Sequence, residues 1–479
     1  MDTQEALRQL EQFRLQVYDS FDHRPDALMD LIDAIASNTT ARSVVELSLN
    51  PHFRREYSSV YDAIDHFFQA SSPEQAAVER RQKEQDLMRI IVQTLPVPQG
   101  RSFWLFGMDA TSVARQYAPT LPDRGFVYQP NPIAGNKPVT IGHQFSVLAL
   151  LPEKETGDPA WIVPLVVRRI TTQETETQVG AELVKTLMDD ESLPFHDDLC
   201  VQVVDSRYGH AKFLSPVARH DNLVTMARLP GNRTLYRQAP TVPKAERGSG
   251  RPKSYGERFV LSEPSTWHEP DEVTQTTHTS RRGRTYIVHI EAWYNMLMRG
   301  KRGYPMHHNP FTLLRVRLLD AEGQPAFKRT MWLIVLGQRR HELSLLEVYE
   351  AYRQRYDLEH YFRSGKQRQL LTSYQTPDDE HEENWWQIVQ LAYVQGWLAR
   401  SLVNSLPRPW ERYLPQPKSG VASLTTVQRD FGRIIREIGT PASEPKPRGK
   451  PPGRAAGTRL EPRERHPVIK KGDKVPKVA

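Results

Sequence analysis

A change of hydrophobic period near residue 101 constrains the fold more than any other feature of this chain. Residues 1–95 repeat apolar side chains at helical spacing, whereas the next apolar stretch, SFWLFGMD, is a short run that ends in Asp109. Further strand-sized runs follow, separated by turn residues, with one helical segment among them. The weaker run at 124–128 is expected to lie in a connecting loop. The predicted order is three strands, a helix and two strands, at 102–109, 139–151, 161–170, 177–190, 199–204 and 223–229.

This order of elements predicts an RNase H-like α/β core, in which a mixed sheet has antiparallel strands at one side. Residues 100–230 supply the first part of this core. Residues 231–342 then interrupt it and are predicted to form a β-rich insertion subdomain. The strand-like runs of the insertion lie at 285–292, 311–319 and 329–336.

Residues 343–438 are predicted to complete the core and to add C-terminal helices. Ser344, followed three residues later by Glu347, forms a capping-box signature at the start of the first helix. The pattern predicts two further helices, at 376–404 and 424–438.

The helical pattern of residues 1–95 has two interpretations. Short helices with intervening turns, together with the basic pair Arg54 and Arg55, favour a helix-turn-helix-like domain that reads DNA. The same pattern also suits a plain helical bundle used for packing or dimerisation.

The tail, residues 439–479, is rich in proline, glycine and basic residues and has little to bury, so we expect it to be disordered. Within it, the segment 445–454 has an Arg-Gly-Lys-Pro core that contains Arg448 and Lys450. Such cores resemble the AT-hook, a cationic segment that lies in the DNA minor groove. A solvated linker is the alternative interpretation.

Charge and cysteine content narrow the class of protein. The formal net charge is +7, and residues 440–479 alone carry 11 Lys and Arg against 4 Asp and Glu, which accounts for all of it. Any anion-binding face in the folded part must therefore arise from local segregation of charge. Cys200 is the only cysteine, so no disulfide can form within the chain. With no signal-peptide pattern and no apolar run of membrane-spanning length, we expect a cytoplasmic protein.

Four polar residues share one face of a predicted helix at residues 352–366. Tyr352, Arg355, Glu359 and Lys366 have offsets of 0, 3, 7 and 14, which at about 100° per residue places them within roughly 60° of one another. A carboxylate can hold a divalent metal, and the two cations and the phenol can hold a phosphate. The face therefore offers both halves of a metal-assisted phosphoryl-transfer site, although a solvated charged surface would show the same spacing.

Three acids are expected to converge. Asp109 follows the first strand, Asp205 follows the fourth, and Glu359 lies on the helix just described. In an RNase H-like sheet these two strands are neighbours, and the helix would pack its carboxylate against the same edge. Three adjacent carboxylates require cations between them, and two Mg²⁺ or Mn²⁺ ions would serve that role and drive phosphoryl transfer. Taken singly, each aspartate is equally compatible with a turn or cap.

The spacing Y-x2-R-x3-E-x6-K and the two aspartate regions, DATS and VVDSRYG, resemble the bacterial insertion-sequence DDE transposases over about residues 100–404. The resemblance implies that Asp109, Asp205 and Glu359 hold the catalytic metals. It implies that the signature's tyrosine, arginine and lysine bind DNA phosphates near the transposon end, and that residues 1–95 bind that end. Related enzymes stack a flipped base on a tryptophan of the insertion, and Trp332 is the candidate here. A buried core tryptophan is the alternative.

The resemblance implies a DNA transposase that cleaves at the terminal inverted repeats of an insertion sequence and joins the 3′-hydroxyls to target DNA. It further implies a homodimer bridging two double-stranded DNA ends, a bacterial setting near the nucleoid, and no membrane partner. Two alternatives remain: an RNase H-like metal-dependent nuclease without strand transfer, and a non-catalytic DNA-binding descendant.

Overall fold

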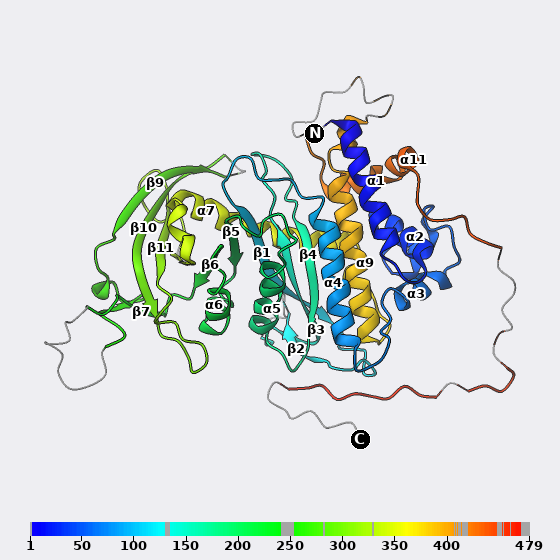
Figure 1. Ribbon diagram of the computed structural model, residues 1–479, viewed down its shortest axis with the longest axis horizontal. Coiled ribbons are helices and arrows are strands. Elements are labelled where there is room, and N and C mark those ends of the chain that lie inside the picture. Colours follow the sequence, from blue (N-terminus) through cyan, green and yellow to red (C-terminus); the bar gives the residue numbers. More distant parts are fainter. Residues whose placement is uncertain are drawn as a thin grey trace.

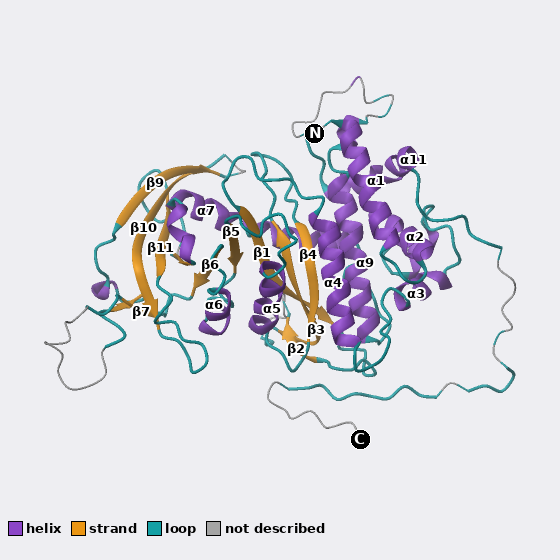
Figure 2. Cartoon of the chain, viewed as in Figure 1, coloured by secondary structure: helices purple, strands orange, loops and turns teal. Residues whose placement is uncertain are grey.

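The computed structural model combines an open mixed β-sheet with a bundle of long helices at one end (Figure 1, Figure 2). None of the described helices is long and apolar enough to cross a membrane. The structure describes residues 2–129, 135–240, 253–280, 283–327, 330–406, 408, 410, 413, 420–447, 453, 455–459 and 461–470.

A single sheet of twelve described strands runs through the molecule in the order β2-β3-β1-β5-β6-β12-β11-β10-β7-β8, with β4 paired to β3 and β9 to β10. The strands are β1 (Trp104–Ala114), β2 (Gly125–Tyr128), β3 (Val139–Leu150), β4 (Val163–Ile170), β5 (Cys200–Val204), β6 (Leu223–Leu229), β7 (Thr234–Tyr236), β8 (Arg258–Val260), β9 (Glu272–Thr279), β10 (Thr285–Met298), β11 (Phe311–Leu319) and β12 (Met331–Leu336).

The described helices cover the sheet and extend beyond it, with short 3₁₀ turns between some of them. They are α1 (Thr3–Asp19), α2 (Pro25–Ala36), α3 (Ser58–Asp65), α4 (Ala76–Val92), α5 (Glu176–Met188), α6 (Ala211–Val217), α7 (Leu345–Gln354), α8 (Tyr356–Arg368), α9 (Asp379–Leu398), α10 (Leu402–Ser405) and α11 (Leu424–Ile438).

The five strands and the helix predicted between residues 102 and 229 are all present. β1 pairs with β3 in antiparallel fashion and with β5 in parallel, and β5 pairs in parallel with β6. Every residue of β5 is buried, as expected of a parallel strand covered on both faces. The predicted neighbourhood of the first and fourth strands is therefore found.

Two details of this region differ from the prediction. β1 does not end at Asp109 but continues to Ala114, because residues 110–114 pair with residues 142–146 of β3. The run at 124–128, expected to be a loop, forms β2 against residues 139–142. Pairing to a strand distant in the sequence decides both cases, and a local pattern does not reveal it.

The inserted strands extend the core sheet. β12 pairs with β6 in antiparallel register, with Trp332 opposite Leu229 and Leu336 opposite Thr225. β11, β10 and β9 continue outward as antiparallel neighbours and form the curved wall that Figure 1 shows beside α7. The three expected strands are present at β10, β11 and β12, with residue 329 outside the described range, and β7, β8 and β9 were not predicted.

The N-terminal helices α1, α2 and α3 pack on α9, the long helix that lies between α4 and α1 in Figure 1. Arg14 on α1 lies in a buried ion pair with Asp33 on α2, and Gln395 on α9 donates to the same carboxylate at 3.3 Å. Their burial joins residues 1–95 to the core, so this region is built into the body of the protein. Arg54 and Arg55, which one of the two interpretations assigned to DNA, pair with acids of α2 and the tail: Asp30, Asp26 and Glu444.

The tail also differs from expectation in its described parts. Ser443 donates its backbone N–H to Asp26 at 2.9 Å. Further on, the backbone N–H groups of His466 and Ile469 donate to the carbonyls of Pro119 and Arg124, at 2.9 and 2.8 Å. These residues lie against β2, whose outer edge offers unpaired backbone groups. The prediction of disorder is therefore wrong for these residues.

Candidate active site

Asp109 and Asp205 lie at equivalent positions on neighbouring strands. β1 and β5 pair in parallel up to Met108 opposite Val204, and the next residue along the chain is an aspartate in both cases: Asp109 within β1 and Asp205 just after β5. Opposed residues of parallel strands project on the same face of the sheet. α8 packs against β1, and Arg355 at its start lies 3.6 Å from the Asp109 carboxylate.

The ion pair of Asp109 with Arg355 does not offset the effects of burial and of Asp205 on the Asp109 carboxyl. Burial, and next the charge of Asp205, raise its pKa to about 7. Arg355 opposes this rise, as does the backbone N–H of Ala110, which donates to Asp109 Oδ1 at 2.8 Å. A buried carboxylate beside a second one is an environment in which a bound cation would be strongly stabilised.

Asp205 also organises the turn that follows β5. Its Oδ1 accepts the backbone N–H of Arg207 at 2.7 Å, and its carbonyl accepts the N–H of Tyr208 at 3.3 Å. The interpretation as a turn former is therefore correct for this residue. The same turn directs the carboxylate beside Asp109, so the structural and chemical interpretations coexist.

The polar face predicted at residues 352–366 spans two helices. α7 ends and α8 begins at Arg355, whose helical φ and ψ of −48° and −30° keep the two nearly continuous. Arg355 Nη2 lies 3.0 Å from Glu359 Oε1, while Nη1 is 3.6 Å from Asp109 Oδ2. The guanidinium therefore stands between these two carboxylates.

Lys366 and Tyr352 border the same region. Lys366 Nζ donates to Thr111 Oγ1 at 2.6 Å and to the Ser112 carbonyl at 3.3 Å, on the extension of β1 beyond Asp109. Burial lowers the pKa of this amine and raises that of the Tyr352 phenol. The Arg355 guanidinium carbon lies 6.0 Å from the centre of the Tyr352 ring.

Asp109 and Asp205 are suited to hold a divalent ion, whereas Glu359 is ion-paired with Arg355 in this structure. The part of the chain that the structure describes brings no three acidic, histidine or cysteine side chains close enough together to hold one metal ion. Asp109 and Asp205 supply oxygen ligands of the type that Mg²⁺ and Mn²⁺ prefer, and the pKa of Asp109 is raised despite its ion pair with Arg355. Glu359 would complete the set only by leaving its ion pair with Arg355.

Three charged residues of this region were missed from the sequence. Arg228 follows Ala227, which is paired with Val204, so it stands beside Asp205 on the next strand. Glu176, at the start of α5, helps to raise the pKa of Asp109 and forms a 3.0 Å ion pair with Arg207. For these residues the sequence offered one signal, the presence of Arg228 near the end of the apolar run LVTMARL.

Trp332 occupies the position of the alternative interpretation, a core tryptophan. Its side chain belongs to a residue that is only 3% exposed, and its ring lies 5.3 Å from Trp267 and 5.8 Å from Trp293. Arg315 lies 4.5 Å from the Trp267 ring, which covers this cluster. Stacking a base on Trp332 would require the ring to leave these contacts, so its burial argues for a packing role.

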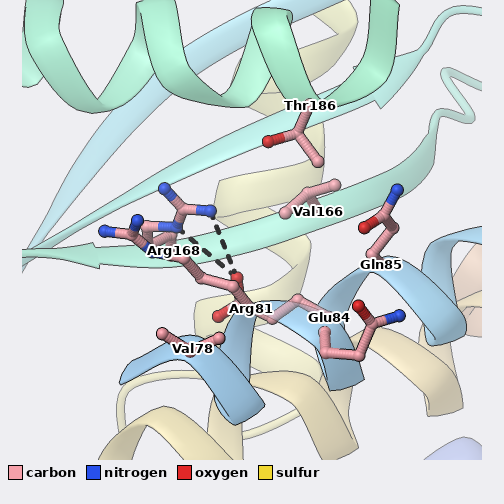
Figure 3. Close-up of a pocket in the computed structure, with 8 residues that line it drawn as sticks. Val78, Arg81, Glu84, Gln85, Val166, Arg168 and Thr186 are labelled. Atoms are coloured by element: carbon pink, nitrogen blue, oxygen red, sulfur yellow. Dashed lines mark hydrogen bonds and ion pairs between the residues drawn. The ribbon is translucent and has the colours of Figure 1, made fainter. Parts of the chain in front are cut away.

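Arg448 and Lys450, the predicted tail contacts to DNA, lie outside the described residues. A cavity of about 250 Å³ lies between α4, β4 and α5, where Arg168 pairs with buried Glu84 at 3.4 Å (Figure 3). Arg168 projects from the face of the sheet opposite to Asp109, because it is paired with Ser146 whereas Asp109 is paired with Val147.

Two neighbouring aspartates, placed just beyond the point where the parallel pairing of β1 and β5 ends and flanked by cations, define a carboxylate site suited to phosphoryl transfer. The family model described as DDE superfamily endonuclease matches residues 16–299, and the chain belongs to this family. The match includes Asp109 and Asp205 and ends before Glu359. None of the curated proteins matches the chain. Membership identifies a nuclease-type enzyme whose substrate is DNA and whose family generally uses divalent metal ions.

Proposed function

We propose that this protein is a DNA transposase of the cut-and-paste type, built on an RNase H-like core. The observation that carries the proposal is the alignment of Asp109 and Asp205 on adjacent parallel strands, with the polar face of α7 and α8 packed against them. In this proposal two Mg²⁺ or Mn²⁺ ions bind at the three acids. A homodimer holds the terminal inverted repeats of an insertion sequence and joins their 3′-hydroxyls to target DNA in a bacterial cell.

Each residue of the site has a separate proposed role. Asp109 and Asp205 would hold the metal, and Glu359 would join them after its ion pair with Arg355 opens. When bound, the metal supplies Lewis acidity for attack on the phosphodiester by water or a 3′-hydroxyl. Arg355, released from the carboxylates, and Lys366 would hold the phosphate oxygens. Tyr352 packs beside Arg355 and limits where the guanidinium can move.

The raised pKa of Asp109 shapes the pH dependence of this reaction. A metal ligand must be deprotonated, and the pKa of this carboxyl is about 7 without metal. Metal binding should therefore release a proton near neutral pH and become weaker as the pH falls below 7.

The test offers the purified protein Mg²⁺ and duplex DNA that carries the terminal repeats of its own element. We expect strand breaks at the repeat ends and joined products, both lost in Asp109→Asn and Asp205→Asn. Asp197→Asn is the matched control, because Asp197 precedes β5 and its side chain is 99% exposed. Cleavage that survives in both active-site variants would contradict the assignment of the acids.

The same assay separates transposition from plain cleavage. The matched family is described as an endonuclease, which also suits a nuclease that cuts without strand transfer. Nicked products that never become joined to a second duplex would support that nuclease and overturn the transposase proposal. Binding without any cleavage would support a non-catalytic DNA-binding descendant.

A further inference from the structure

Most arginines near the N-terminal helices are neutralised by acids, but a row of cations beside the acid pair is not. Arg54, Arg55 and Arg14 all pair with aspartates of α2. In contrast, eight described Lys and Arg side chains from β6 to the turn after β10 form no ion pair with a described carboxylate. Five of these eight carry the argument below: Arg228, Arg233, Arg299, Lys301 and Arg302. We call these five residues the cationic track.

The track starts at the acid pair. Arg228 stands beside Asp205 in the sheet, is exposed, and lies close enough to Tyr352 for its charge to lower the pKa of that phenol, against the larger effect of burial. The turn after Asp205 packs directly on the backbone here, since a Cβ on Gly209 would lie 2.7 Å from the Arg228 carbonyl. Only glycine permits this approach, which fixes the turn against β6.

The track continues through the same turn to Arg233. Its Nη2 lies 3.4 Å from the Gly209 carbonyl and also contacts the His210 imidazole. Burial, then Arg233 and Lys301, lower the pKa of His210, so Lys301 lies near this histidine. The His210 imidazole therefore adds a hydrogen-bonding group beside these cations and contacts Arg233 directly.

The far end of the track is a tight turn held against α6. Backbone hydrogen bonds join Lys301 and Tyr304 in both directions, at 3.0 and 2.9 Å. Ser215 on α6 donates to the Pro305 carbonyl at 3.2 Å and anchors the turn. Lys301 and Arg302 are exposed on it, and Arg299 stacks 5.1 Å from the centre of the Tyr236 ring.

A set of cations without a described ion-pair partner, extending from a phosphodiester-cleaving site, matches the charge pattern of a DNA backbone. We propose that the cationic track binds the sugar-phosphate backbone of double-stranded DNA on the side of the acid pair that faces the insertion. This inference rests on the proposed function, which places a scissile phosphodiester at Asp109 and Asp205. It assigns the turn after β10 to the surface that contacts the DNA next to the scissile bond. This assignment does not depend on any base stacking on Trp332.

The first test measures the affinity of the full-length protein for a fluorescein-labelled 40-base-pair duplex of arbitrary sequence over a range of KCl concentrations. Each lost phosphate contact lowers the slope of log affinity against log salt by about 0.9. We expect Arg233→Ala with Lys301→Ala to lower the slope by about 2. The matched control, Arg8→Ala with Lys185→Ala, removes one exposed cation from α1 and one from α5 and should leave the slope unchanged.

The second test locates the DNA. Cys200 is buried, so a thiol-reactive photocrosslinker attached after Lys301→Cys should react at that position alone. We expect crosslinks from Lys301→Cys to duplex DNA and none from Lys185→Cys. An unchanged salt slope in the track variant, an equal change in the control, or equal crosslinking from both positions would overturn the proposal.

Failure of the track and failure of the proposed function give different results. Asp205→Asn should bind the duplex with the wild-type salt slope and lack Mg²⁺-dependent cleavage. If the wild-type protein cleaves no DNA while Arg233→Ala with Lys301→Ala still lowers the salt slope and Lys301→Cys still crosslinks to the duplex, the track stands and the transposase proposal falls. If cleavage occurs and the track variant keeps the full slope, the proposed function stands and the track is wrong.

Discussion

Asp109→Asn should make the folded chain more stable at neutral and alkaline pH while removing the carboxylate needed for metal binding. The amide keeps the shape of the side chain and its oxygen can still accept the N–H of Ala110, which lies 2.8 Å from Oδ1. What it removes is a buried negative charge beside Asp205. The variant therefore isolates the electrostatic cost of assembling the acid pair.

The magnitude follows from the pKa of Asp109, which rises from 3.8 to about 7 on folding. The folded chain then binds more protons than the unfolded chain between these values, so wild-type stability falls as pH rises through this window and stays low above it. A shift of about 3 units corresponds to about 4 kcal/mol. This value is an upper bound, because the side chain remains 19% exposed and water screens part of the cost.

The assay is urea unfolding followed by tryptophan fluorescence, from pH 4.5 to pH 8.5. The advantage of Asp109→Asn should be small at pH 4.5, grow with pH, and level off above pH 7. Saturating MgCl2 should stabilise the wild-type protein at pH 8.5 and leave the variant unchanged, because ligand binding to the native state adds stability. Asp197→Asn should match the wild type throughout. A variant no more stable than wild type at pH 8.5, or a difference independent of pH, would refute the reasoning.

Three further predictions concern packing and DNA contact. Asp33→Ala leaves Arg14 buried without its partner and should cost about 3–5 kcal/mol in the free energy of unfolding; a loss below 1 kcal/mol would contradict this. Trp332→Ala should cost about 3–5 kcal/mol by the same measurement, whereas a variant with wild-type stability but weakened DNA binding would favour base stacking. Lys366→Met should lower the salt slope of DNA binding by about 0.9 and leave the circular dichroism spectrum unchanged.

The strand pattern carried much of the information about the core. Apolar runs at 139–151 and 199–204 predicted strands that the structure contains, because buried strands need apolar side chains on consecutive positions. The helix caps could also be predicted from the sequence. Ser344 accepts the N–H of Glu347, whose side chain accepts in return, and such caps depend only on residues three apart.

Pairing between strands that come from separate parts of the sequence could not be predicted. The run at 124–128 became β2 only because residues 139–142 offer an edge, and the insertion joined the core because β12 pairs with β6. Charge pairing is equally non-local. Arg54 and Arg55 looked like candidates for DNA, yet Asp30 neutralises them, and Arg228 gained its significance from standing beside Asp205.

By itself, then, the sequence determined the order of the main core strands and helices and the spacing of four polar groups at residues 352–366, because each depends on local periodicity or short spacing. The adjacency of the two acid-bearing strands followed from the expected fold class and not from any local pattern. The tertiary structure alone decided that Arg355 stands between Asp109 and Glu359, that Trp332 is buried, and which cations remain unpaired. These features depend on distances between side chains from separate elements, and only packing sets those distances.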